Sequence, residues 1–322
     1  MRVVGLILLA VVVLIGAATG YFFLHYPNVA GPSQLAIDRT TDRLLRGGYL
    51  VNNVMGCRGC HSQPVADAFA GPPVPETQFG GGRAFHQGHG VPGVVYSRNI
   101  TQGALREWTD GELLRAITAG VSKDGRALFP VMPYADYGTL ERDDLYSVIA
   151  YLRTIPTVKN VPPPNQLDFP VNLLVRTLPH DAQFVQRPPS KEAIAYGKYM
   201  VTAAGCGHCH TRMDAQGNPV GVPFAGGREF NEPGQYLVRS ANITPDNETG
   251  IGKWTREQFI ARFRSNTEED YRKMKVAPGE PNTVMPWWEF SGMTEFDLGT
   301  IYDYLRSIQP SRNAVEKFAA AR

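Results

Sequence analysis

The first part of the chain is a single apolar run, residues 3–24, that contains no charged residue. In a helix that rises about 1.5 Å per residue, this run would be about 33 Å long, which is enough to cross a bilayer core. Arg2 precedes the run, and Tyr26 lies at its far end, where aromatic residues favour the membrane interface. We therefore predict a transmembrane anchor over residues 1–25. A cleaved signal sequence is the alternative, because small residues follow the most apolar part of the run.

Beyond the anchor, apolar residues recur at helical spacing in several segments, separated by loops rich in glycine and proline. The pattern predicts helices over residues 35–55, 108–120 and 140–155. Thr109 or Asp110 would cap the second of these, and Pro156 would stop the third. Proline is frequent over residues 161–190, which predicts an extended connector with a short apolar segment inside it. Packing of this stretch against both halves of the chain is the alternative.

The segments on either side of this connector repeat one another. The matched pairs are GGYLV and GKYMV, FGGGR and FAGGR, SRNIT and SANIT, and VMPY and VMPW. The chain is therefore predicted to hold two copies of one helical module, in a mainly α fold. We place a stalk at residues 26–37, the modules at 38–160 and 191–310 with the linker at 161–190 between them, and a tail at 311–322.

Each module contains one C-x-x-C-H sequence, which is the attachment signature of c-type haem. Two thiols on one helical turn can each add to a vinyl group of the porphyrin, and the histidine that follows then lies under the iron. A zinc site would need further ligands for each pair, and the chain has four cysteines in all. A thioredoxin-type redox pair needs no histidine and requires a βαβ pattern, which we do not find. The motifs predict two covalently bound haem c groups, attached at Cys57, Cys60, Cys206 and Cys209.

The iron ligands follow from the same repeat. His61 and His210 end the two motifs and would be the proximal ligands. Met132 and Met285 stand in the repeated Met-Pro pair and would be the distal ligands, because a soft thioether stabilises ferrous iron. The proline after each methionine has a fixed φ and no N–H, which helps to hold the ligand loop extended.

Composition narrows the possible partners and the compartment. The chain has 322 residues with a formal net charge of +2, which gives no preference for nucleic acid. All four cysteines lie in the two motifs, so none is left for a structural disulfide. Haem c is attached outside the energised membrane in bacteria. We therefore expect a single-pass protein of the inner membrane, with its haem domains in the periplasm.

With these motifs in hand, each half resembles a class I cytochrome c domain. The FGGR, NIT and MP elements are similar to those in multihaem cytochrome subunits of membrane-bound alcohol and gluconate dehydrogenases, over residues 38–310. Those subunits usually have three attachment motifs, and their membrane segment is not N-terminal. Guanidinium groups pair well with carboxylates and an indole N–H can donate to them; the resemblance likewise implies contacts with the haem propionates from Arg83, Arg228, Trp108 and Trp254.

We expect a dihaem electron carrier, not an enzyme. It would carry electrons from a membrane-associated donor, such as a dehydrogenase or a quinol-oxidising complex. The acceptor would be another cytochrome c, a terminal oxidase or another membrane complex. Two six-coordinate irons would leave no position for a small-molecule substrate. The alternative is a haem enzyme, such as a dihaem peroxidase or a thiosulfate-oxidising cytochrome. A peroxidase needs a vacant or displaceable ligand, and the Met-Pro pair in both copies argues against it.

Overall fold

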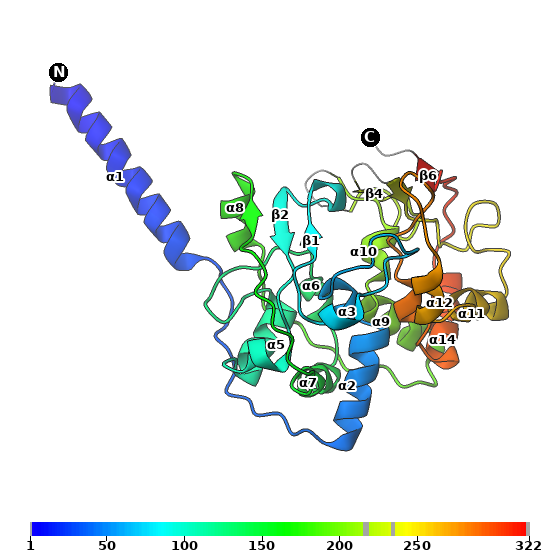
Figure 1. The fold of residues 1–322 in the computed structure, drawn as a ribbon. Coiled ribbons are helices and arrows are strands. Elements are labelled where there is room, and N and C mark those ends of the chain that lie inside the picture. Colours follow the sequence, from blue (N-terminus) through cyan, green and yellow to red (C-terminus); the bar gives the residue numbers. More distant parts are fainter. Residues whose placement is uncertain (1, 215–218, 233–235, 320–322) are drawn as a thin grey trace.

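Short helices build most of the globular part of the protein (Figure 1). The computed structural model describes residues 2–214, 219–232 and 236–319. The first half of the chain contains α1 (Arg2–His25), α2 (Thr41–Asn53), α3 (Cys57–Cys60), α4 (Gln102–Leu105), α5 (Asp110–Ala119), α6 (Tyr134–Tyr137) and α7 (Arg142–Leu152). The second contains α8 (Val171–Leu174), α9 (Ala193–Ala203), α10 (Cys206–His210), α11 (Arg256–Arg264), α12 (Glu268–Lys273), α13 (Trp287–Phe290) and α14 (Glu295–Ser307). Three 3-10 turns are η1 (Pro75–Thr77), η2 (Gln87–His89) and η3 (Val175–Thr177).

The predicted apolar run forms one continuous helix, α1, which projects away from the rest of the protein (Figure 1). None of its side chains is buried, although they are almost all apolar. Among the described residues, α1 is the one helix long and apolar enough to cross a membrane, a test that an N-terminal signal sequence would also pass. Arg176, just after α8, donates hydrogen bonds to the carbonyls of Phe23 and Tyr26, which ties the end of α1 to the globular part.

Two helix pairs form the centre of the protein, α2 with α7 and α9 with α14. Each pair crosses at a glycine. A Cβ atom at Gly47 would lie 1.9 Å from the carbonyl oxygen of Ser147, and one at Gly197 would lie 1.9 Å from that of Thr300. No larger residue fits at either crossing without moving a backbone. The two glycines occupy matched positions of the sequence repeat, so both halves use the same helix contact.

The main hydrophobic core is continuous across both halves. Its most buried members include Leu145 and Ile149 of α7 together with Met200 of α9 and Leu298 of α14. Helix ends follow local capping signals. Thr109 and Gly120 bound α5 as predicted. The first predicted helix, over residues 35–55, starts later than expected because the hydroxyl of Thr40 accepts the N–H of Arg43 and begins α2 there.

The structure also contains two small antiparallel sheets that the helical pattern does not predict. One has the order β1 (Ala84–Phe85), β2 (Gly93–Tyr96) and β3 (Gln166–Leu167), and the other β4 (Glu229–Glu232), β5 (Tyr236–Arg239) and β6 (Phe318–Ala319). The first two strands of each sheet lie at equivalent places in the two halves. The proline-rich segment supplies β3, and Gly93 pairs with Leu167. Of the predicted tail, residues 320–322 lie outside the described part.

Candidate functional site

Each C-x-x-C-H motif forms a single helical turn that begins after a glycine in the left-handed conformation. Gly56 has φ 68° before α3, and Gly205 has φ 63° before α10. The turn places both thiols of a motif on one short helix and the histidine at its C-terminal end. This is the arrangement that two thioether bonds to one porphyrin edge require, so the local fold of both motifs fits a covalently attached haem.

The two histidines are held in the same way. Nδ1 of His61 lies 2.6 Å from the carbonyl oxygen of Arg98, and Nδ1 of His210 lies 2.7 Å from that of Ala241. A proton on Nδ1 leaves the lone pair of Nε2 free for a metal. Burial lowers the pKa of both imidazoles, partly offset by these hydrogen bonds, and favours the neutral form that binds iron. The donor atoms therefore fit an axial haem ligand.

The glycine-rich segment of each half explains why those carbonyls are in place. Gly81 donates its N–H to the carbonyl of His61, and Gly226 donates to that of His210. Both glycines have positive φ and lie so close to the segment that follows β2 or β5 that a Cβ would come 2.5 Å from the carbonyl carbon of Arg98 or Ala241. The repeated FGGGR and FAGGR sequences thus brace both the backbone of the histidine and its hydrogen-bond acceptor.

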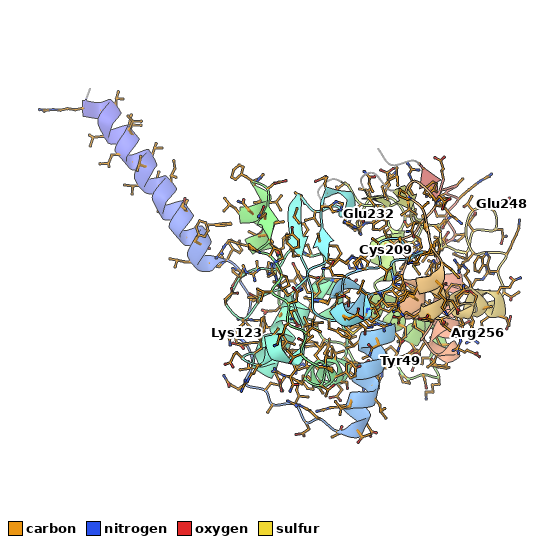
Figure 2. All side chains as sticks on the ribbon, viewed as in Figure 1. Tyr49, Lys123, Cys209, Glu232, Glu248 and Arg256 are labelled. Atoms are coloured by element: carbon orange, nitrogen blue, oxygen red, sulfur yellow. The ribbon has the colours of Figure 1, made fainter. Side chains whose placement is uncertain are left out.

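The four cysteines form no disulfide and are half-buried. Cys57 packs against the main core, whereas Cys60 packs against the small cluster under β1 and β2. Burial raises the pKa of Cys60 to about 11; the charge of Arg83 lowers it, and the charges of Glu289 and Cys209 raise it further. Cys209, which Figure 2 labels, belongs to the other motif, so the surroundings of Cys60 include a group from the second half of the chain.

Both predicted methionines lie in the same kind of turn. Met132 and Met285 are partly buried against the main core, and each carbonyl accepts an N–H from two residues later. The prolines that follow have nearly the same backbone angles, φ −78° and ψ 57° for Pro133, and φ −81° and ψ 63° for Pro286. Each proline then precedes a one-turn helix, α6 or α13. The methionine segments of the two halves are thus structural equivalents.

The two arginines and the two tryptophans that are predicted to contact the haem propionates differ in their surroundings. The guanidinium of Arg83 donates a hydrogen bond of 2.8 Å to the carbonyl of Gly59, and that of Arg228 donates to the carbonyl of His208. Both arginines therefore lie against the attachment motifs. Trp108 packs against the main core, whereas the side chain of Trp254 is 37% exposed. The two tryptophans thus differ in environment.

Each methionine segment also reaches the attachment motif of the other half. Oδ2 of Asp136 in α6 lies 2.8 Å from Nε2 of His208 in the second motif. Glu289 of α13 lies against Gly59 of the first motif, where a Cβ would come 2.8 Å from its Oε2. The sequence interpretation missed both residues. The signal was available, because an acidic residue stands four positions after the methionine in both copies.

A second group of titratable side chains joins the two halves at η2 and β4. Nε2 of His89 lies 2.7 Å and Nε2 of His86 lies 3.5 Å from oxygens of Glu232. Figure 2 labels Glu232. The three side chains are close enough to hold a metal ion. However, Nδ1 of each ring accepts a backbone N–H, from Gly88 or from His86. In its neutral form each ring would therefore carry its proton on Nε2, facing Glu232, which leaves no free nitrogen lone pair for a metal ion.

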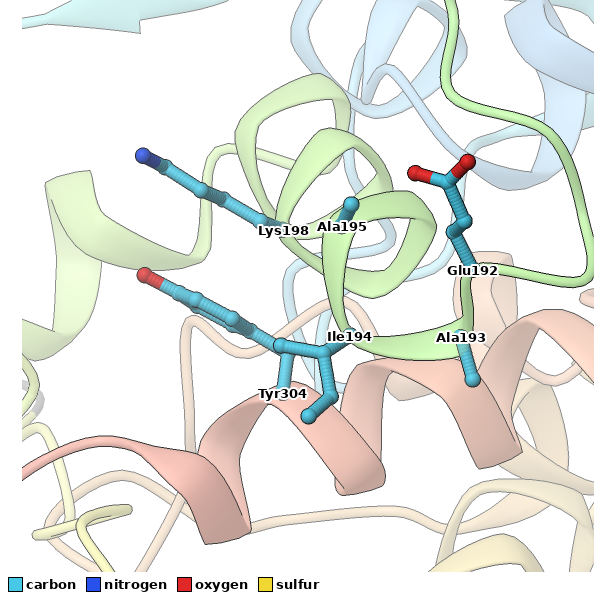
Figure 3. Close-up of a pocket in the computed structure, with 6 residues that line it drawn as sticks. All are labelled: Glu192, Ala193, Ile194, Ala195, Lys198 and Tyr304. Atoms are coloured by element: carbon cyan, nitrogen blue, oxygen red, sulfur yellow. The ribbon is translucent and has the colours of Figure 1, made fainter.

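The surface between α9 and α14 carries a shallow, open depression of about 530 Å³ (Figure 3). It is lined mainly by apolar groups, with Glu192, Lys198 and Tyr304 among them. None of the predicted site residues lines it.

No protein-family model matches the chain. The chain is 25% identical over 298 residues to the alcohol dehydrogenase (quinone), cytochrome c subunit of Gluconacetobacter polyoxogenes, across 88% of this chain and 59% of that protein. It is 25% identical over 290 residues to the gluconate 2-dehydrogenase cytochrome c subunit of Pantoea cypripedii, across 85% of this chain and 62% of the relative. A "diheme cytochrome c-type" protein of Cereibacter sphaeroides is 26% identical over 168 residues, half of this chain and 55% of its own length.

The chain thus spans less than two thirds of the length of the first two relatives. The similarity confirms the resemblance that the motifs indicate, and a cytochrome c carries covalently bound haem at C-x-x-C-H sequences. The mostly helical fold, with its small sheets and one N-terminal apolar helix, fits these relatives. Over most of its length, the chain is a homologue of the cytochrome c subunits of alcohol and gluconate dehydrogenases.

Proposed function

We propose that this chain is a membrane-anchored electron-transfer subunit with two covalent haem c groups, which accepts electrons from a membrane-bound dehydrogenase. One observation carries the proposal. Both C-x-x-C-H turns present a half-buried histidine whose Nδ1 is hydrogen-bonded to a backbone carbonyl, at 2.6 Å and 2.7 Å, in the same way in each half. The relatives named as dehydrogenase cytochrome subunits support the choice of donor.

Each half would hold its haem through three kinds of residue. The thiols would form the thioether bonds, the imidazole would supply the proximal nitrogen, and the methionine would supply the distal sulfur. These residues are Cys57, Cys60, His61 and Met132 in the first half and Cys206, Cys209, His210 and Met285 in the second. Bound haem supplies reversible one-electron chemistry, and its potential is raised by thioether ligation relative to two histidines. The Met-Pro turns keep the sulfur in one position in both oxidation states.

The proximity of the motifs supports electron transfer from one haem to the other. Asp136 of the first half lies 2.8 Å from His208 of the second motif, and Glu289 of the second half lies against Gly59 of the first motif. Arg83 and Arg228 lie against the motifs and would turn toward the haem propionates, since each guanidinium has donors beyond the one that its backbone carbonyl uses. Trp108 and Trp254 would donate their indole N–H groups to the same carboxylates.

We further propose that α1 anchors the protein in the inner membrane, with the haem-binding part in the periplasm. Haem c attachment takes place on that side, and Arg2 would remain on the cytoplasmic side. The segment around α8 supports this orientation. It is joined to the end of α1 by Arg176, and it exposes apolar side chains where an interface would lie: Phe169 is 79% and Leu174 52% exposed. The acceptor would be another cytochrome c or a terminal oxidase.

Optical spectroscopy of the purified full chain tests the haem content and ligation. Reduced and oxidised spectra should show two low-spin haems that remain on the polypeptide after extraction with acidified organic solvent. Carbon monoxide should leave the reduced spectrum unchanged, because both distal positions are occupied. Loss of the pigment would overturn the covalent attachment. A high-spin haem that binds carbon monoxide would instead favour a haem enzyme, such as a dihaem peroxidase.

Isolation from native membranes tests the partner and the anchor. The chain should stay in the membrane fraction after a high-salt wash and should be released by mild detergent together with a dehydrogenase. A variant in which a cleavable leader peptide replaces residues 2–25 should appear in the soluble periplasmic fraction with both haems attached. Recovery of the intact chain in the soluble fraction would overturn the anchor, and co-isolation with only an oxidase would change the proposed donor.

A further inference from the structure

Glu289 is a fully buried acidic residue whose carboxylate has no side-chain hydrogen-bond partner. The residue is 0% exposed, and among the described residues the backbone N–H of Gly59 is the polar group that favours its ionised form from within hydrogen-bonding range. It stands on α13, in the second half, and its Oε2 faces the backbone of Gly59 inside the first attachment motif. Because a buried, unpaired carboxylate is costly, a chain gains nothing in stability by keeping one there. This position therefore calls for a functional explanation.

The charged and titratable groups around Glu289 come from three helices besides its own and from the segment before β1. Arg58, Cys57 and Cys60 lie on or next to α3, Arg83 lies before β1, Glu268 lies on α12, and Tyr137 lies on α6. The charge of Arg58 lowers the pKa of Glu289 more than that of Arg83 does, but Arg58 is already paired with Glu268 at 2.7 Å and stacked over the ring of Trp288. Glu289 therefore shares a cation that another carboxylate already binds.

This environment makes Glu289 able to change protonation near neutral pH. Burial raises the pKa of its carboxyl group to about 8; the charge of Arg58, a backbone hydrogen bond from Gly59 and the charge of Arg83 lower it, and the charge of Glu268 raises it. The gain or loss of one charge on the neighbouring motif is then a large perturbation, since there is little water to screen it.

We propose that Glu289 is a proton-binding site coupled to the oxidation state of the haem on the first motif. The proposal rests on the haem attachment proposed above. Oxidised haem carries one more positive charge than reduced haem, so oxidation favours the carboxylate and reduction favours the neutral acid. When one electron arrives from the donor protein, Glu289 takes up one proton from solvent and forms one O–H bond. Reoxidation releases the proton. By linkage, protonation of Glu289 must in turn raise the reduction potential of that haem.

The second motif offers an internal comparison. Asp136 holds the position equivalent to Glu289, but its side chain is 38% exposed and is paired with His208. Water and a partner screen its charge, so the second haem should show little proton coupling through this position. The two halves thus differ at one matched acidic residue, and this difference supplies the control.

The test is a potentiometric titration of both haems in the detergent-solubilised full chain, from about pH 6 to pH 9. In the wild type, one haem potential should fall as pH rises. A proton affinity tenfold higher in the reduced state would appear as a total fall of about 59 mV. Glu289→Gln keeps the shape but cannot ionise, so that potential should remain at its high, low-pH value throughout. Asp136→Asn should leave the pH-dependent fall intact. A slope that persists in Glu289→Gln would overturn the proposal.

A second measurement needs no variant and covers the case in which Glu289→Gln does not fold. Reduction of the wild-type protein in weakly buffered solution near pH 8 should take up protons from the medium, detected with a pH indicator dye. A carboxyl infrared band should appear on reduction. Reduction of both haems without either signal would overturn the inference alone, because covalent haem and electron transfer would then still stand. Absence of covalent haem would instead overturn the proposed function.

Discussion

Tyr199 donates a hydrogen bond of 2.7 Å to Oδ2 of Asp144 in the other half of the chain. Tyr49, at the matched position of the first half, donates to Oδ2 of Asp297. In each half, the tyrosine donates its hydroxyl hydrogen bond to the matched aspartate of the other half. The two hydrogen bonds are thus reciprocal, as across the interface of a two-fold symmetric dimer. Asp136 and Glu289 are reciprocal in the same way, because each lies against the attachment motif of the other half. This packing sets each attachment motif against the other half of the chain, as the proposed transfer of electrons between two haems would require.

Removal of the Tyr199 hydroxyl should destabilise the protein. The hydroxyl is buried; it donates to Asp144 and accepts the N–H of Glu141. Tyr199→Phe should lower the free energy of unfolding by about 1.5–3 kcal/mol, the usual range for a hydrogen bond to a charged group. Urea unfolding of the haem-loaded protein measures this. Tyr146→Phe is the control, because no hydrogen bond to that hydroxyl occurs within the described residues; an equal loss in both variants would contradict the prediction.

Asp144 should make stability depend on acid pH. Burial opposes its ionisation, but two hydrogen bonds from Arg46, at 2.9 Å and 2.8 Å, and the bond from Tyr199 outweigh this and lower its pKa. A lowered pKa adds stability that is complete above the unfolded pKa of about 3.9 and is lost as pH falls through the folded pKa. Asp144→Asn should cost about 3–5 kcal/mol at neutral pH.

The same variant should differ less from the wild type as the medium becomes acidic. Unfolding free energies measured at several pH values from neutral down to about pH 3 should converge, because the wild-type carboxylate becomes protonated. A constant difference across that range would show that the cost of Asp144→Asn is steric rather than electrostatic.

Local signals made the attachment motifs and several helix ends predictable. The C-x-x-C-H sequences, the Met-Pro pairs and the caps of α5 all depend on residues within a few positions of one another. The strands were not predictable, because β1 and β3 have two residues each and depend on partners far away in sequence. The burial of Glu289 was not predictable either. It results from packing of α13 on a motif of the other half, which no local pattern records.

Substitution of either methionine should affect one haem only. Met132 and Met285 lie in equivalent turns of different halves, so Met132→Ala should open the distal position of the first haem and Met285→Ala that of the second. Each variant should show one carbon monoxide-binding haem and one unchanged low-spin haem with wild-type potential. Loss of both low-spin signals from one substitution would contradict separate sites.

The hydrogen bond that orients His210 can be perturbed without touching a ligand. Gly226 has φ 74°, and a Cβ there would lie 2.5 Å from the carbonyl carbon and oxygen of Ala241, the acceptor for Nδ1 of His210. Gly226→Ala should push that carbonyl away and weaken the bond. A less basic imidazole stabilises ferric iron less, so the potential of the second haem should rise while that of the first stays constant.

The neighbouring Gly227 separates this effect from backbone strain, since it has φ 86° but its Cβ would meet nothing closer than 3.6 Å. Both variants should lose stability from an alanine at positive φ; if Gly227→Ala shifts the potential equally, the hydrogen bond is not the cause.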